Sequence, residues 1–313
     1  MKNRNHMRSG YRSLAFVLAL VVLAGCARKE SAPAQMTFSS PEDAVVAVVD
    51  AVKANDTAQL LGILGPDGKK VLSSGDEVAD QQARELFLTA YQERARLSAE
   101  GDRTILSIGA EEWPLPIPLV KEGNNWRFDT AAGLQEILFR RIGGNELSTM
   151  QLCKSYVDAQ KQYASKGHDG KAKGLYAGKF ISSDGKHDGL FWKSDDPNDK
   201  SPLGDLAAQA AIEGYATEES KTTPFHGYYF RILTGRGASA PGGAKSYLVN
   251  GNMRDGFAML AYPTEYKNSG VMTFIIDDHG MVYQKDLGAD TSTAALAITV
   301  FDPDTSWEKA ESE

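Results

Sequence analysis

Residues 271–285 read VMTFIIDDHGMVYQK. The runs 271–276 and 282–285 are rich in β-branched and aromatic residues, which favour extended strands. Asp277, Asp278, His279 and Gly280 lie between them, and Asp and Gly are typical of tight turns. The stretch therefore predicts a β-hairpin, which is the clearest one in the chain.

The rest of the last third of the chain has the same pattern of strands separated by turns. Further strands are predicted at residues 228–233, 246–249 and 256–262, separated by turns that contain glycine. Upstream, residues 131–165 have the spacing of a long helix with a break at Gly143-Gly144. The apolar positions predicted to be buried in its second half are Leu147, Met150, Cys153, Tyr156, Val157 and Tyr163. Residues 167–198 predict irregular structure, and residues 203–213 a further helix.

The first part of the chain predicts helices followed by strands. Ser40 is a suitable N-cap for a helix that starts at Pro41, and a second helix is predicted at residues 57–64. Residues 78–99 predict an amphipathic helix whose apolar positions are Ala83, Leu86, Phe87, Ala90, Tyr91 and Leu97. Strands are expected at 104–108, 117–121 and 126–129, with a hairpin turn at 122–125.

The predicted fold class is α+β. A helical and antiparallel-sheet N-terminal unit is followed by a long helix packed on an antiparallel meander. The predicted divisions are a leader at 1–25, a flexible tether at 26–36, an N-terminal domain at 37–133 and a C-terminal domain at 134–313.

The leader has the features of a lipoprotein signal peptide. Basic residues come first, an apolar run spans residues 14–23, and the segment ends in Leu23-Ala24-Gly25-Cys26. This order predicts cleavage before Cys26 and lipidation of its thiol; a simple secretory signal is the alternative. Ala27 at the following position favours the outer membrane over the inner one. The predicted location is an exported protein, anchored by lipid to the membrane and facing the periplasm.

The net charge and the number of cysteines argue against two classes of function, nucleic-acid binding and cysteine-based catalysis. The chain has a net charge of −7, and removal of the leader's four positive charges leaves −11, which excludes a nucleic-acid-binding surface of the usual basic kind. Cys153 is the second of only two cysteines. Its helical setting favours a buried structural residue over a catalytic one.

Two segments and one histidine are candidates for binding or catalysis. The segment Trp113-Pro114-Leu115-Pro116-Ile117-Pro118 predicts an extended edge strand or crossover, and alternatively a contact surface for another protein. His226 is a weak site candidate, with a structural role favoured over a catalytic one. The aspartates between Asp184 and Asp199 could bind calcium, although solvated turns have the same composition. No catalytic residue, cofactor or metal ligand is assigned.

Several segments resemble known families. The start of the first helix through residue 61 is similar to nuclear-transport-factor-like cone domains. The order of residues 145–165, 228–233, 257–263 and 270–283 is similar to type IV pilin-like headgroups, but without the apolar N-terminal helix of pilins. A wider resemblance rests on residues 38–42, 112–120, 126–133, 225–229, 240–243 and 283–288. These look like domain-of-unknown-function family 2950, a family of bacterial lipoproteins, which implies export and lipidation but no activity.

The function expected from the sequence is a non-catalytic envelope module that binds a partner protein or another envelope component. The alternative is a periplasmic hydrolase with a pocket in the N-terminal cone or near His226. An enzyme needs ionisable groups that converge in a pocket, and a binding module needs an exposed apolar patch.

Overall fold

The computed structural model describes residues 35–196, 198–206 and 224–310. The predicted leader, Cys26, nearly all of the tether and most of the predicted helix at 203–213 lie outside these residues. Contacts between Cα atoms group Pro33–Glu313 into one compact unit. The predicted boundary between residues 133 and 134 stays a prediction.

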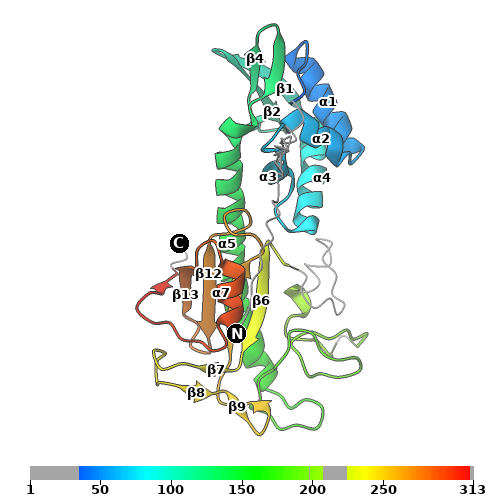
Figure 1. Cartoon of the computed structure of the whole chain (residues 1–313). Coiled ribbons are helices and arrows are strands. Elements are labelled where there is room, and N and C mark those ends of the chain that lie inside the picture. The colour runs from blue at the N-terminus through cyan, green and yellow to red at the C-terminus, as the bar shows by residue number, and fades with distance from the viewer. Residues whose placement is uncertain (1–34, 197, 207–223, 311–313) are drawn as a thin grey trace, which may run out of the picture. The chain divides into compact units, whose positions relative to one another are not determined.

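The part of the chain that the structure describes begins with four helices (Figure 1). They are α1 (Pro41–Lys53), α2 (Thr57–Leu64), α3 (Gly68–Leu72) and α4 (Glu77–Glu93). The Ser40 hydroxyl accepts a hydrogen bond from the Asp43 amide at 3.0 Å, so the predicted cap and start of α1 are confirmed. Helix α2 has the predicted bounds, and the Asp56 carboxylate caps it. Helix α3 was not predicted.

An antiparallel sheet follows the helices. Its strands are β1 (Ala95–Glu100), β2 (Arg103–Ile108), β3 (Trp113–Pro114), β4 (Leu119–Glu122) and β5 (Asn125–Phe128). They are ordered β1-β2-β4-β5, with β3 also paired to β2. The predicted helix at 78–99 was wrong in its last part, because residues 95–100 pair with β2 along their whole length. Sheet pairing outweighs local helical spacing there.

Apolar side chains of these helices and strands form one core. Its fully buried members come from α1, α2, β2, β4 and β5: Ala44, Val45, Val49, Ala51, Leu60, Ile63, Leu64, Leu106, Ile108, Leu119 and Phe128. Phe87, Ala90 and Tyr91 of α4 pack against it, whereas Leu86 is 69% exposed. The predicted buried face of this helix is therefore wrong at Leu86.

Helix α5 (Thr130–Ala164) connects the two sheets without interruption (Figure 1). The predicted break at Gly143-Gly144 is wrong. Each glycine costs about 1 kcal/mol of helix propensity relative to alanine. Contacts on either side offset that cost: Arg141 and Asn145 donate to backbone carbonyls of other segments, and the Glu146 carboxylate accepts from the amides of Val271 and Met272.

Gly133 on α5 has no room for a side chain, which yields a stability prediction. A Cβ atom there would lie 2.5 Å from the Pro116 carbonyl oxygen and 2.8 Å from Ile117 Cα, both backbone atoms. We expect Gly133→Ala to lower the free energy of unfolding by about 2 kcal/mol or more. At Gly144 a Cβ would meet nothing within 4 Å. Gly144→Ala should therefore raise that free energy by about 1 kcal/mol, and chemical denaturation of both variants checks the opposite signs.

The second sheet confirms the predicted antiparallel meander. Its strands are β6 (Tyr228–Leu233), β11 (Ala258–Pro263), β12 (Met272–Asp277), β13 (Val282–Asp286) and β14 (Glu308–Lys309), in the order β14-β13-β12-β11-β6. The hairpin predicted at residues 271–285 is formed by β12 and β13. Two short ribbons add β7 (Gly235–Arg236) with β8 (Lys245–Ser246), and β9 (Leu248–Val249) with β10 (Asn252–Met253). Helix α7 (Thr291–Ala297) follows β13 and was not predicted.

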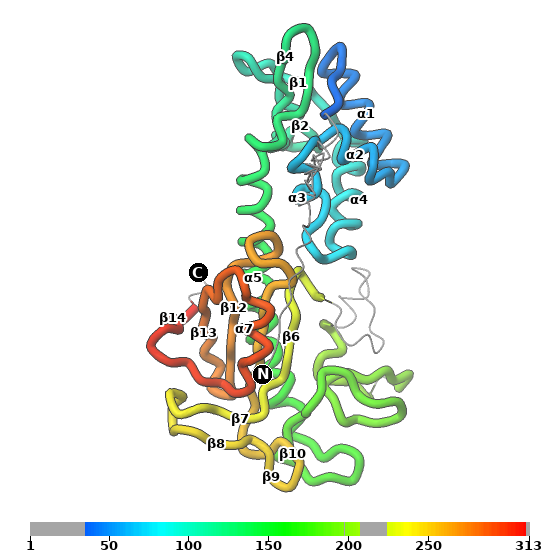
Figure 2. Tube along the Cα trace, viewed as in Figure 1, coloured from blue at the N-terminus to red at the C-terminus, as the bar shows by residue number. Residues whose placement is uncertain are grey.

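Helix α5 packs its second half against this sheet. Met150, Cys153, Tyr156, Val157 and Tyr163 are buried with strand residues, as predicted, whereas Leu147 is 61% exposed and was predicted wrongly. The Cys153 thiol is fully buried, and burial raises its pKa to about 12, as expected of a structural cysteine. Between α5 and residue 198 the described residues run as loops (Figure 2), as predicted for residues 167–198. Residues 204–206 are helical, at the start of the helix predicted for residues 203–213.

The fold class is thus α+β: N-terminal helices with an antiparallel sheet, one long helix, and a C-terminal antiparallel sheet. Within the described ranges, no helix is both long enough and apolar enough to cross a membrane.

Candidate functional site

A cavity of about 450 Å³ lies in the N-terminal part of the chain. This volume is within the range of about 300–1,000 Å³ typical of small-molecule sites. Its walls come from α1 to α5 and the adjoining strands and loops, and most lining side chains are apolar. They are Val48, Val52, Leu60, Leu64, Val71, Leu72, Ala79, Ala83, Phe87, Leu106, Leu115, Pro116, Ile117, Phe128 and Ile137. The polar lining residues are Ser74, Asp80, Arg84, Arg141 and Asn145.

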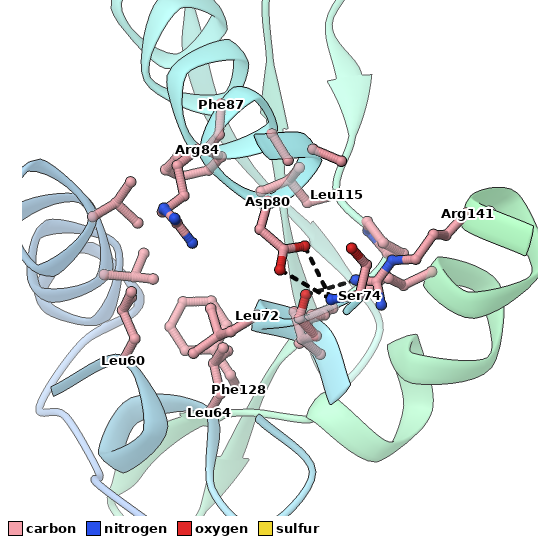
Figure 3. A pocket seen from close by; sticks show the side chains of 18 of the residues that line it. Leu60, Leu64, Leu72, Ser74, Asp80, Arg84, Phe87, Leu115, Phe128 and Arg141 are labelled. Carbon is pink, nitrogen blue, oxygen red and sulfur yellow. Dashed lines mark hydrogen bonds between the residues drawn. The ribbon is translucent and has the colours of Figure 1, made fainter. Parts of the chain in front are cut away.

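Asp80 is held by the backbone at the start of α4. Its two carboxylate oxygens lie 3.0 and 3.1 Å from the Ser74 amide, which donates to them (Figure 3). Burial raises the pKa of Asp80 above its usual value, although the hydrogen bonds from Ser74 and the charges of Arg141 and Arg84 oppose that rise. Asp80 is therefore a fixed acceptor in the cavity wall.

Arg141 of α5 is also fully engaged. Its guanidinium donates to the carbonyl oxygens of Lys70 at 3.0 Å and Val71 at 2.8 Å, and to Asn268 Oδ1 at 2.8 Å. A longer bond of 3.4 Å reaches the Ser73 carbonyl. Burial lowers its pKa, while Asp80 and Glu265 act in the other direction. Arg141 thus holds the C-terminal end of α3 against α5 and against the loop between β11 and β12.

Arg84 is different, because it extends from α4 into the cavity without such partners (Figure 3). Among the described residues, no hydrogen bond or ion pair within 4 Å is found for its guanidinium, and its effect on Asp80 is a longer-range charge interaction. One turn of helix separates Asp80 from Arg84, so both side chains face the same space. A partly buried guanidinium surrounded by apolar walls is available to an anionic ligand group.

The segment with alternating prolines contributes to both the surface and the cavity. Trp113 and Pro114 form the short strand β3 on β2, as expected for an edge strand, and Trp113 is 55% exposed. The Arg140 guanidinium lies 5.2 Å from the Trp113 ring centroid. Pro116 lines the cavity, and Pro118 is buried. A contact surface for another protein at this segment stays a prediction.

His226 lies in the turn that precedes β6. Its backbone has a positive φ of 49°, and its ring meets the Phe225 ring edge to face at 4.2 Å. The next amide, of Gly227, donates to the buried Asp76 carboxylate at 2.9 Å. His226 is not one of the residues that line the cavity. The structure therefore does not bring the candidate histidine together with Asp80, Arg84 or Arg141.

The aspartates between Asp184 and Asp199 bind separate partners in the described part of the loop. Asp188 accepts from the Lys179 ammonium at 2.8 Å and from the Ser183 amide at 2.7 Å. Its pKa is lowered to about 2 because these hydrogen bonds outweigh the opposing effect of burial. Asp199 instead accepts from the Trp192 indole at 3.1 Å and lies 3.1 Å from the His187 ring. These contacts tie the loop together and do not direct its carboxylates to one point.

The charged cavity residues were missed by the sequence analysis. Asp80 and Arg84 look like the solvated face of an amphipathic helix, and Arg141 looks like one more charge on a long helix. A signal did exist in the four-residue spacing of Asp80 and Arg84, next to the apolar Ala83 and Phe87. Without the positions of α1, α2 and β5 around α4, that spacing does not distinguish a cavity wall from a surface.

Comparison with known proteins gives one match. A family model described as a protein of unknown function (DUF2950) matches residues 35–310, which covers all the elements above. No curated protein and no solved structure matches the chain. The resemblance to pilin-like headgroups is therefore not supported by a structural match, whereas the family expected from the sequence is confirmed. The chain belongs to the DUF2950 family.

Proposed function

We propose that this protein is a lipid-anchored envelope module that binds a small molecule with an apolar body and one anionic group. The ligand occupies the cavity between the N-terminal helices and the first sheet. The observation that carries this proposal is the Arg84 guanidinium, which faces apolar walls and has no hydrogen-bond partner among the described residues.

The composition of the walls supports an amphipathic ligand. Leu60, Leu64, Leu72 and Phe128 offer contact only to apolar groups, and burial of apolar surface contributes about 25 cal/mol per Å². The charged groups are not equivalent, because Arg141 is engaged by carbonyl oxygens and Asp80 by the Ser74 amide. Arg84 is thus the group left to pair with an anion. A carboxylate or phosphate ester would form a charge-assisted hydrogen bond there.

The cavity favours binding over hydrolysis. Ser74 is the one hydroxyl-bearing residue in its lining, and its oxygen accepts the Asp76 amide at 3.2 Å. Asp80 is the one carboxylate in the lining, and it is oriented toward the Ser74 amide. A hydrolase needs a nucleophile within hydrogen-bond reach of a base that is free to accept its proton. These lining residues do not form such a pair.

Location is the second part of the proposal. The leader ending in Leu23-Ala24-Gly25-Cys26 supports export and attachment of lipid to Cys26, with the outer membrane favoured by Ala27. A protein held at a membrane surface meets amphipathic molecules that leave or enter the bilayer. A lipid anchor would therefore hold the cavity close to the amphipathic molecules that it is proposed to bind.

The test compares an anionic ligand with its neutral analogue. Residues 33–313, which form one compact unit, are titrated with dodecanoate and with dodecanol by isothermal calorimetry. We expect dodecanoate to bind more tightly. Arg84→Gln should weaken dodecanoate binding about ten-fold or more, because a charge-assisted hydrogen bond of roughly 1.5–3 kcal/mol is lost.

Two comparisons make the result specific to Arg84. Dodecanol binding should be nearly the same in the wild type and in Arg84→Gln, because the alcohol has no charge to lose. Arg103 is an exposed arginine on β2 outside the cavity lining, so Arg103→Gln should bind both ligands like the wild type. Equal loss of dodecanoate affinity in both arginine variants would contradict the proposal.

A further inference from the structure

The turn between β12 and β13 brings together three side chains suited to a metal ion. A ligand atom from each of Asp277, Asp278 and His279 lies within 4.8 Å of the others. His279 Nδ1 is 2.8 Å from Asp277 Oδ2 and 3.2 Å from Asp278 Oδ1, so both carboxylates converge on one nitrogen. Among the described residues, this is the one such group of three.

A buried hydroxyl without a hydrogen-bond partner gives independent evidence at the same place. Tyr247 is 0% exposed, and its hydroxyl has no hydrogen-bond partner among the residues that the structure describes. Oδ1 of Asp278 is also buried and makes no hydrogen bond with the described residues, although it lies 3.2 Å from His279 Nδ1. Each unsatisfied buried oxygen costs stability and needs an explanation, for which a bound ion is a recognised answer.

The Tyr247 ring lies close to the Asp278 carboxylate. A Cβ atom on Gly256 would lie 2.6 Å from Cε1 of Tyr247 and 3.2 Å from Oδ2 of Asp278, so ring and carboxylate border the same small space. Burial raises the pKa of Tyr247, and the charges of Asp277 and Asp278 raise it further, as expected for a phenol near two anions. Glycine at 256, with φ of 137°, leaves this space open.

The charges of the cluster favour a cation. Asp277 is buried at the end of β12, and Asp278 is partly buried. Arg236 is the neighbouring positive charge, and its guanidinium donates to the carbonyls of Gly243 and Gly242. Counted without His279, the two carboxylates and the one guanidinium leave a net negative charge, which a divalent cation would offset.

We propose that Asp277, Asp278 and His279 bind a divalent transition-metal cation, with the Tyr247 hydroxyl facing the ion. Two carboxylate oxygens and one imidazole nitrogen suit Mn²⁺ or Zn²⁺ better than Ca²⁺, which prefers oxygen ligands alone. The cation takes the position of the proton in the hydrogen bond between His279 and Asp277, and that proton is released to solvent. This site is separate from the N-terminal cavity and does not depend on its ligand.

The experiment uses the full-length protein, treated with chelator and then titrated with Mn²⁺ alone. Binding is followed by electron paramagnetic resonance of the free ion, and Zn²⁺ is tested in competition. We expect one equivalent of Mn²⁺ to bind, with Zn²⁺ displacing it. Asp278→Asn and His279→Gln should each lower the affinity by about ten-fold or more, since removal of even an outer-shell partner has effects of that size.

The variants and the control distinguish loss of a metal ligand from loss of the fold. His279 is 58% exposed in its side chain, so His279→Gln can be compared with the wild type without a change in the core, and thermal unfolding confirms that each variant is folded. Asp199→Asn, in the separate aspartate loop, should bind Mn²⁺ like the wild type. No Mn²⁺ binding by the wild type, or equal affinity in the wild type, Asp278→Asn and His279→Gln, would overturn the proposal.

Discussion

Arg141→Met is expected to lower the free energy of unfolding by about 2 kcal/mol, because several acceptors, most of them partly buried, lose their donor at once. The guanidinium serves the carbonyls of Lys70, Val71 and Ser73 and the Asn268 side chain. Methionine replaces the apolar part of the side chain but donates no hydrogen bond. Urea denaturation followed by circular dichroism measures the loss.

The adjacent arginine provides the matched control. Arg140 lies next to Arg141 on α5, but its side chain forms an exposed ion pair with Glu136 at 2.6 Å. Exposed pairs of this spacing contribute about 0.3–0.5 kcal/mol, so Arg140→Met should change stability by well under the Arg141 effect. Equal effects of the two substitutions would show that the carbonyl contacts of Arg141 do not stabilise the fold.

Cys26→Ser is expected to abolish membrane attachment. In the proposed pathway the thiol accepts a diacylglyceryl group, and serine offers no thiol for that reaction. Each buried methylene of a lipid chain contributes about 0.8 kcal/mol, so two or more chains give stable attachment that the variant lacks. Wild-type protein should take up labelled palmitate and sediment with membranes, whereas Cys26→Ser should do neither.

Cys153→Ala tests whether the effect belongs to Cys26. The Cys153 thiol is buried in the core between α5 and the second sheet, out of reach of a lipid-transferring enzyme. This variant should keep both the palmitate label and the membrane fraction. Labelled Cys26→Ser, or a membrane-bound Cys26→Ser with no label, would contradict lipid anchoring at this position.

Local signals in the sequence predicted the elements whose structure depends on near neighbours. Ser40 caps α1 through a bond three residues away, and the bounds of α2 follow from the Asp56 cap and the terminal Gly65. The β12–β13 hairpin follows from its turn residues and two apolar runs. In each case the information lies within a few residues.

Distant contacts account for the errors. Leu97 continues the helical spacing of α4, yet it pairs with Leu106 of β2, and a strand partner is not visible in a local pattern. Gly143-Gly144 has the composition of a break, but Asn145 and Glu146 bond the loop before β12 and hold the helix in place. The short strands β7 to β10 likewise depend on pairing between brief segments.

The two proposed sites could not be predicted from the sequence for the same reason. Asp80, Arg84 and Arg141 come from helices about sixty residues apart in the chain, and only the fold brings them to one cavity. Asp277, Asp278 and His279 were visible as a turn. Their role as candidate ligands depends on the unpartnered Tyr247 hydroxyl, which arrives from a different strand region.

The most direct test of the cavity proposal is a crystal structure of residues 33–313 grown with dodecanoate. We expect the carboxylate within hydrogen-bond distance of the Arg84 guanidinium, and the alkyl chain along Leu60, Leu64 and Phe128. An empty cavity with dodecanoate bound elsewhere, or a ligand whose carboxylate points away from Arg84, would contradict the account.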